Sequence, residues 1–131
     1  ALGERIDLPM HLASAARAVS RQVVEDVLEQ ANMHIGGQPR VAILGVAYKP
    51  GSSVTDDSLA RSLIARASHT GAKISTYDPH ATLPPSFPFQ HRRCGTLDEA
   101  ISEAQTVIIG CPHAEFDGID FGYRKVINPW T

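Results

Sequence analysis

The chain has 131 residues, of which 43% are hydrophobic and 20% charged, and its formal net charge is −2 at pH 7. These values predict one soluble globular protein with its own core, and the scattered basic residues exclude a nucleic-acid-binding surface. No apolar run approaches the roughly 20 residues of a membrane helix and no signal-peptide pattern opens the chain, so we expect a cytoplasmic protein that makes no membrane contact.

The first periodic segment is helical. Small apolar residues recur every three or four positions from Leu12 to Met33, with charged residues between them. Pro9 precedes this stretch, and Gly36-Gly37 follows it. We expect a long helix that serves as a connector or a dimer element. Residues 1–36 would then form a helical connector, and residues 37–131 an α/β domain.

After this helix, strand and helix patterns alternate. Strands are expected at residues 40–45, 73–77, 106–110 and 126–127, with one short edge strand near 89–92. Helices are expected at residues 57–68 and from Thr96 or Asp98 to Ala104. This alternation predicts a three-layer α/β/α Rossmann-like fold, in which a parallel sheet of about five strands carries helices on both faces.

The loop after the first of these strands is the candidate ligand site. Its sequence, Gly45-Val46-Ala47-Tyr48-Lys49-Pro50, matches neither the G-x-G-x-x-G fingerprint nor a Walker A loop. Tyr48 and Lys49 would nevertheless emerge at the carboxyl end of a buried strand, where open α/β sheets bind ligands. A lysine ammonium suits a phosphate, and an aromatic ring suits a base or sugar. An ordinary surface turn is the alternative, and the Asp56-Asp57 pair argues against an anion.

Other candidate residues are better explained structurally. Cys94 and Cys111 lack metal-site spacing, and no histidine pair has the helical spacing of a zinc protease, so no metal site is expected. Asp78 lies too far along the chain to bind a ribose, so a turn-forming Asp-Pro is preferred. His113 is expected to be a hydrogen-bonded structural residue, although it follows a strand end. Trp130 packs either on this domain or on a neighbouring one.

Together these motifs resemble the C-terminal domain of the UDP-glucose/GDP-mannose dehydrogenase family. Residues 41–60 show its apolar strand followed by G-x-A-[FY]-K, and Ser75-Thr76-Tyr77-Asp78-Pro79 its strand ending in Y-D-P. Upstream, Ile6-Asp7-Leu8-Pro9 through Ala15-Ala16-Arg17 resembles its central helix. Downstream, residues 104–109 and His113-Ala114-Glu115-Phe116 resemble its late strand and T-x-H-x-x-F segment. The resemblance covers nearly the whole chain.

The resemblance implies a function. In this family the first domain binds NAD, a cysteine between the domains forms a thioester during two oxidations, and the C-terminal domain holds the nucleotide end of the sugar nucleotide. Lys49 matches the family's lysine at that site and Tyr48 its aromatic neighbour. The expected ligand is a UDP-sugar, or less readily a GDP-sugar, and the central helix implies a homodimer.

The chain has no NAD fingerprint and no catalytic cysteine segment, so no cofactor is expected in it and no dehydrogenase activity on its own. Because it begins with Ala1, it is consistent with a piece cut from a longer protein.

Three departures from the family pattern keep an alternative open. Ser20 replaces the usual asparagine, Asp56 an arginine, and Asn128-Pro129-Trp130-Thr131 an aspartate followed by an arginine. A reversed charge at Asp56 would weaken the binding of an anion if that side chain faces the site. The alternative is therefore a non-catalytic binding or assembly module that has lost substrate contacts. A third hypothesis is an unrelated flavodoxin-like or Rossmann-like domain, in which the Tyr48-Lys49 loop is only surface.

Overall fold

The computed structural model of the protein describes residues 13–33 and 38–131, with side chains described from Arg21 onward in the first stretch. Its helical elements are α2 (Ala13–Gln30), α3 (Leu59–Ala67), α4 (Leu97–Ile101) and the 3₁₀ turn η2 (Ala114–Phe116). Its strands are β1 (Arg40–Leu44), β2 (Lys73–Tyr77), β3 (Arg92–Arg93), β4 (Thr106–Ile109) and β5 (Lys125–Ile127). The Ile6-Asp7-Leu8-Pro9 segment and the Ser20 side chain lie outside this description.

The five strands form one parallel sheet in the order β3-β2-β1-β4-β5, as the sequence predicts. β1 is the central strand, and its last residue, Leu44, is paired with Tyr77 of β2 on one side and Ile109 of β4 on the other. The chain moves outward from β1 to β3, then returns to the opposite side of β1. This reversal places a topological switch point between β1 and β4.

The central strands are buried on both faces, which explains their continuous apolar sequence. In β1, Val41 and Ile43 join the core cluster on the α2 and α3 side, while Ala42 and Leu44 join the cluster on the α4 side. Each of the four is at most 1% exposed. Complete burial of a side chain such as leucine or isoleucine stabilises the fold by about 1.5–3 kcal/mol.

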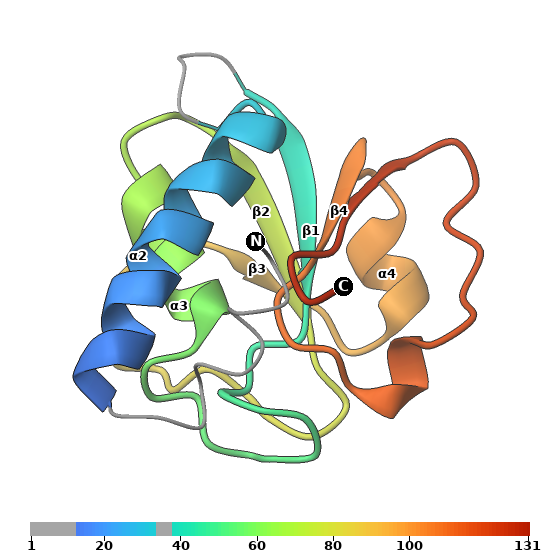
Figure 1. The fold of residues 1–131 in the computed structure, drawn as a ribbon. Helices are drawn as coiled ribbons and strands as arrows, with labels where there is room; N and C mark the ends of the chain where they lie inside the picture. Colours follow the sequence, from blue (N-terminus) through green and yellow to red (C-terminus); the bar gives the residue numbers. More distant parts are fainter. Residues whose placement is uncertain (1–12, 34–37) are drawn as a thin grey trace.

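Helices cover both faces of the sheet, with α2 and α3 on one side and α4 on the other (Figure 1). From Arg21 onward, α2 turns its apolar side toward the core through three buried residues at helical spacing, Val24, Val27 and Leu28, and Ala31, just after the helix, is buried too. The exposed positions of α2 in this half are polar or charged: Arg21, Gln22, Glu25, Asp26, Glu29 and Gln30. This half of α2 therefore packs on the domain. Among the described residues, no helix has the length and apolar character needed to cross a membrane.

The predicted elements differ from the structure mainly at their ends. α3 begins after Ser58, whose hydroxyl accepts a hydrogen bond from the Arg61 N–H at 3.2 Å and caps the helix. Thr96 caps α4 in the same way. The edge strand expected at residues 89–92 lies instead at Arg92–Arg93, and η2 was not anticipated.

Two glycines allow β1 and β4 to approach closely where both strands end. A Cβ atom on Gly45, whose φ is +95°, would lie 2.5 Å from the carbonyl oxygen of Cys111. A Cβ atom on Gly110 would lie 2.4 Å from the carbonyl oxygen of Gly45. Backbone atoms cannot move away as a side chain can, so both positions require glycine.

We predict that Gly110→Ala lowers the free energy of unfolding by about 2–3 kcal/mol, because the added methyl overpacks the contact between β1 and β4. Urea denaturation measures this change. Gly95→Ala is the matched control, since a Cβ atom there meets nothing within 4 Å, and it should change stability by less than about 0.5 kcal/mol. Equal stability of the two variants would contradict the close approach.

Candidate functional site

The candidate site lies at the carboxyl edge of the sheet, where the chain leaves β1, β2 and β4. In open α/β sheets, ligands bind at this edge beside the switch point. Three segments meet there: the long loop from Gly45 to Ser58, the Asp78-Pro79 turn after β2, and the segment from Gly110 to His113 after β4. Hydrogen bonds between these segments determine the shape of the edge.

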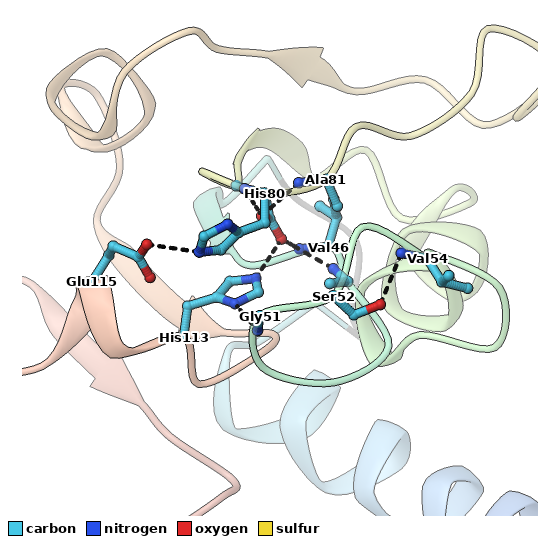
Figure 2. A network of polar contacts seen from close by, with 10 residues as sticks. Val46, Gly51, Ser52, Val54, His80, Ala81, His113 and Glu115 are labelled. Atoms are coloured by element: carbon cyan, nitrogen blue, oxygen red, sulfur yellow. Dashed lines mark hydrogen bonds and ion pairs between the residues drawn. The ribbon is translucent and has the colours of Figure 1, made fainter.

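The Asp78 carboxylate joins the segments and is completely buried. Its Oδ2 atom accepts hydrogen bonds from the backbone N–H groups of Val46 at 2.7 Å and Ala47 at 3.0 Å. Its Oδ1 atom accepts from the N–H groups of His80 at 2.7 Å and Ala81 at 2.9 Å. In Figure 2 the labelled donors Val46, His80 and Ala81 converge from the loops after β1 and β2. The expected Asp-Pro turn is thus present, and its carboxylate also holds the neighbouring loop.

The imidazole of His113 supplies the fifth hydrogen bond to Asp78. Its Nε2 atom lies 2.9 Å from Asp78 Oδ2, and the His113 side chain is fully buried. On the other side of the ring, Nδ1 accepts a hydrogen bond of 2.9 Å from the N–H of Gly51. Because Nδ1 is an acceptor, the proton belongs on Nε2, which donates it to Asp78. His113 is therefore the structural residue that the sequence predicts.

Gly51 belongs to a tight turn that begins at Lys49. The Ser52 N–H donates to the Lys49 carbonyl at 3.1 Å, and Gly51 has a φ of +77°. Pro50 and Gly51 therefore occupy the two central positions of a type II turn, which favours these two residue types. At the base of the loop, the Tyr48 N–H donates to the Val54 carbonyl at 2.7 Å. The backbone that carries Tyr48 and Lys49 is thus well defined.

The side chains of Tyr48 and Lys49 face solvent. Tyr48 is 46% exposed, although it follows three buried residues, and Lys49 is also exposed. The chain has three lysines, all within its described part, and Lys73 and Lys125 are the first residues of their strands. Those two lie at the amino edge of the sheet. Lys49 is the one lysine of the three at the carboxyl edge, beside the switch point.

A second polar pair lies outside the buried network. His80 Nε2 is 2.6 Å from Glu115 Oε2, and the rings of His80 and His113 are 4.8 Å apart between centroids (Figure 2). The pKa of Glu115 is lowered, first by its own backbone N–H and also by the nearby His80 ring. Ligand atoms of these three residues lie close enough for a metal ion. Both ring nitrogens of His113 already have partners, however, so the cluster suits an ion pair better than a metal.

Neither cysteine has the properties of a nucleophile. Both thiols are buried and unpaired. Burial, together with the negative charge of Asp78, raises the pKa of Cys111 to about 12. Burial also raises the pKa of Cys94. Because a reactive cysteine needs a thiolate at neutral pH, these groups are unsuited to covalent catalysis.

Two of the residues that depart from the family pattern can be located. Asp56 has a side chain that is 85% exposed, and its carboxylate lies 3.6 Å from the Arg61 guanidinium. A cation on α3 therefore partly compensates the charge that Asp56 adds. Trp130 packs on both core clusters of this domain, and its indole N–H donates to the Ile109 carbonyl at 2.9 Å. Of the two alternatives for Trp130, the structure therefore shows packing on its own domain.

The residues at this edge do not fit a dinucleotide cofactor. In a dinucleotide-binding unit, a short glycine-rich turn joins the first strand to its helix, and an acidic residue binds the ribose. Here the connection extends from Gly45 to Ser58, and Asp78 is buried with both oxygens occupied by protein donors. The edge therefore offers an exposed cation and an aromatic ring rather than a pyrophosphate cradle.

Sequence reasoning identified the residues of the buried network separately but not their connection. Asp78 and His113 are 35 residues apart, and His113 and Gly51 are 62 apart. No local pattern predicts such pairs. The available signal was topological: each residue lies in the segment that leaves a strand of one parallel sheet, and the carboxyl ends of such strands share an edge.

The sheet order is that of a doubly wound α/β domain, a class that binds ligands at the carboxyl edge of its sheet. Residues 42–129 match the model of the UDP-glucose/GDP-mannose dehydrogenase family, UDP binding domain. The chain belongs to this family, which excludes an unrelated flavodoxin-like domain.

Individual relatives agree with this assignment. The UDP-N-acetyl-D-mannosamine dehydrogenase of Methanococcus maripaludis is 31% identical over 97 residues, which are 74% of this chain and 21% of the relative. The UDP-glucose 6-dehydrogenase of Rhizobium meliloti is 28% identical over 124 residues, 91% of this chain and 28% of the relative. The structure of a UDP-glucose dehydrogenase from Pyrobaculum islandicum has the same fold, with a TM-score of 0.69 and 20% identity over 97% of this chain and 30% of that one. The chain thus spans less than a third of the length of these relatives.

We predict that Asp78→Asn destabilises the domain by about 3 kcal/mol. An asparagine replaces one acceptor oxygen with an NH₂ group, which would face backbone N–H donors in a buried position. Asp120→Asn is the matched control, because its carboxylate accepts a single hydrogen bond, from the Gly122 N–H, at the surface. It should cost less than about 0.5 kcal/mol in urea denaturation. A mild effect of Asp78→Asn would show that the network does not hold the edge together.

Proposed function

We propose that this chain is the C-terminal, nucleotide-sugar-binding part of a nucleotide-sugar 6-dehydrogenase, and that its ligand is a UDP-sugar. The match of residues 42–129 to the family's UDP binding domain carries this proposal. The relatives named above act on UDP-sugars by name, so a GDP-sugar is less favoured. Those names also do not favour the alternative of a non-catalytic assembly module.

In this proposal, the Lys49 ammonium binds the diphosphate and the Tyr48 ring contacts the base or sugar. Three observations support these roles. Both side chains are exposed at the carboxyl edge, and their backbone is fixed by the turn at Pro50-Gly51. Lys49 is the one lysine at this edge. A charge-assisted contact to a phosphate oxygen is the strongest single interaction that such a site offers.

The remaining chemistry is assigned to the rest of a longer protein. Two successive oxidations to the uronic acid, with two NAD⁺, require the cofactor domain and catalytic cysteine of the parent enzyme. This chain would bind the substrate and would have no dehydrogenase activity alone. The division into a connector of residues 1–36 and a domain of residues 37–131, and a cytoplasmic location, remain parts of the proposal.

A homodimer through the N-terminal helix also remains a proposal. The exposed positions of α2 from Arg21 onward are polar or charged, so they offer no apolar contact surface. The supporting feature is the pattern of small apolar residues earlier in the sequence, Leu12, Ala15, Ala16 and Val19. A dimer contact would therefore fall before Arg21.

Titration calorimetry of the chain with UDP, UDP-glucose and GDP-mannose tests the ligand. We predict binding of the UDP compounds, and a 10- to 100-fold loss of affinity in Lys49→Ala, because one phosphate contact of about 1.5–3 kcal/mol is removed.

Lys73→Ala is the matched control for Lys49→Ala. It removes another exposed lysine, at the amino edge of the same sheet, so affinity should stay within about twofold, the scale of an exposed long-range charge effect. Equal losses in the two variants would contradict the role of Lys49. A folded chain that binds none of the three compounds would overturn the proposed function.

A further inference from the structure

We propose that His113, oriented by Asp78, is a positioning residue for ligand binding: it anchors the turn that carries Lys49. Its Nδ1 atom accepts the Gly51 N–H, and this contact determines where the Lys49 ammonium can meet a nucleoside diphosphate. The inference rests on the proposed function, because it concerns the affinity that Lys49 contributes.

The ring of His113 has no nitrogen left for proton transfer. Nε2 is engaged with Asp78 at 2.9 Å and Nδ1 with Gly51 at 2.9 Å, and the residue is 1% exposed. A general base needs a free nitrogen within reach of a substrate proton. An Asp–His pair at a ligand-binding edge would suggest a catalytic dyad, but here it can act only through the backbone that it holds.

Within the turn itself the other hydrogen bonds are local, and the nearest other long-range bond of the loop is that of the Ala47 N–H to Asp78, two residues before Lys49. Ser52 donates to the Lys49 carbonyl, Val54 donates to the Ser52 hydroxyl, and Tyr48 donates to the Val54 carbonyl. These hydrogen bonds define the internal shape of the turn but not its place on the domain. The bond from Gly51 to His113 connects it to a segment 62 residues away, beside β4.

Anchoring would favour binding through preorganisation. When Lys49 binds a ligand, its side chain and the turn that carries it must become ordered. The conformational entropy lost in this ordering reduces the net free energy of binding. A turn already fixed to the domain reduces this loss and raises affinity without any contact between His113 and the ligand. The Asp78 carboxylate is also needed, because it holds the His113 proton on Nε2 and so leaves Nδ1 free to accept the Gly51 N–H.

Two substitutions of His113 separate anchoring from general stability. In His113→Asn the side-chain oxygen lies near the position of Nδ1, so it can still accept the Gly51 N–H while the contact with Asp78 is lost. In His113→Gln the amide nitrogen lies near the position of Nε2, so the contact with Asp78 survives and Gly51 loses its acceptor. Each variant loses one buried hydrogen bond, so both should lower the midpoint of thermal unfolding similarly.

The expected difference is in affinity for UDP, measured by calorimetry on the 131-residue chain. His113→Gln should bind about tenfold more weakly than the unmodified chain, and His113→Asn within about twofold of it. In a Lys49→Ala background, His113→Gln should cause no further loss, since its effect acts through Lys49. Equal affinities of the two His113 variants, or an undiminished effect of His113→Gln without Lys49, would overturn the proposal.

A measurement on the unmodified chain covers the case in which a variant does not fold. Long-range ¹H–¹⁵N spectra should show His113 as the neutral tautomer with its proton on Nε2. A proton on Nδ1 would overturn the anchoring, because Gly51 would then have no acceptor. If the unmodified chain shows no UDP binding, the proposed function fails; if it binds UDP but Lys49→Ala has no effect, only the proposed role of Lys49 fails. In either case the role of His113 in ligand binding fails as well. The tautomer still decides separately whether His113 holds the turn.

Discussion

The hydrogen bonding of one buried carboxylate, that of Asp78, determines the geometry of the carboxyl edge of the sheet. Removing a carboxylate from water costs several kcal/mol unless donors compensate it. Four backbone N–H groups and the His113 imidazole provide this compensation. Because these donors come from the segments after β1, β2 and β4, satisfying the charge also fixes the segments relative to one another. The close approach of Gly45 and Gly110 brings two of them together beneath the network.

This arrangement reassigns a position that other doubly wound domains use for binding. An acidic residue after the second strand commonly faces the ribose of a dinucleotide. In this chain the carboxylate after the second strand belongs to Asp78, and both of its oxygens accept hydrogen bonds from protein donors. The neighbouring histidine, His113, also has both ring nitrogens engaged. The exposed turn with Tyr48 and Lys49 stays open to a ligand. In the proposed function, this exposed ammonium and ring are the groups that meet an anionic ligand.

The parts of the fold that the sequence predicted are those governed by local patterns. β1, β2 and β4 follow from apolar or alternating runs ended by glycine or Asp-Pro, and Ser58 and Thr96 mark helix starts through their hydroxyls. The edge strand was placed a few residues too early because Phe89 has a high strand propensity. Its ring instead meets the Phe87 ring edge to face, with 5.5 Å between centroids, and packs on the core. The buried network was not predictable in this way, because it joins residues that only the sheet topology brings together. Lys49 was predicted from its position after a strand. The hydrogen bond from Gly51 to His113, which holds its turn, was not predicted.

The most direct test of the account is a nuclear magnetic resonance titration of the ¹⁵N-labelled chain with UDP. If the ligand binds at the Lys49 turn, the largest amide shifts will fall on Tyr48, Lys49 and Gly51 and on the segment that begins at Gly110. Amides at the opposite edge of the sheet, such as those of Lys73 and Gln105, will not move. Shifts concentrated at that opposite edge, or a chain that remains unchanged at saturating UDP, would contradict the account.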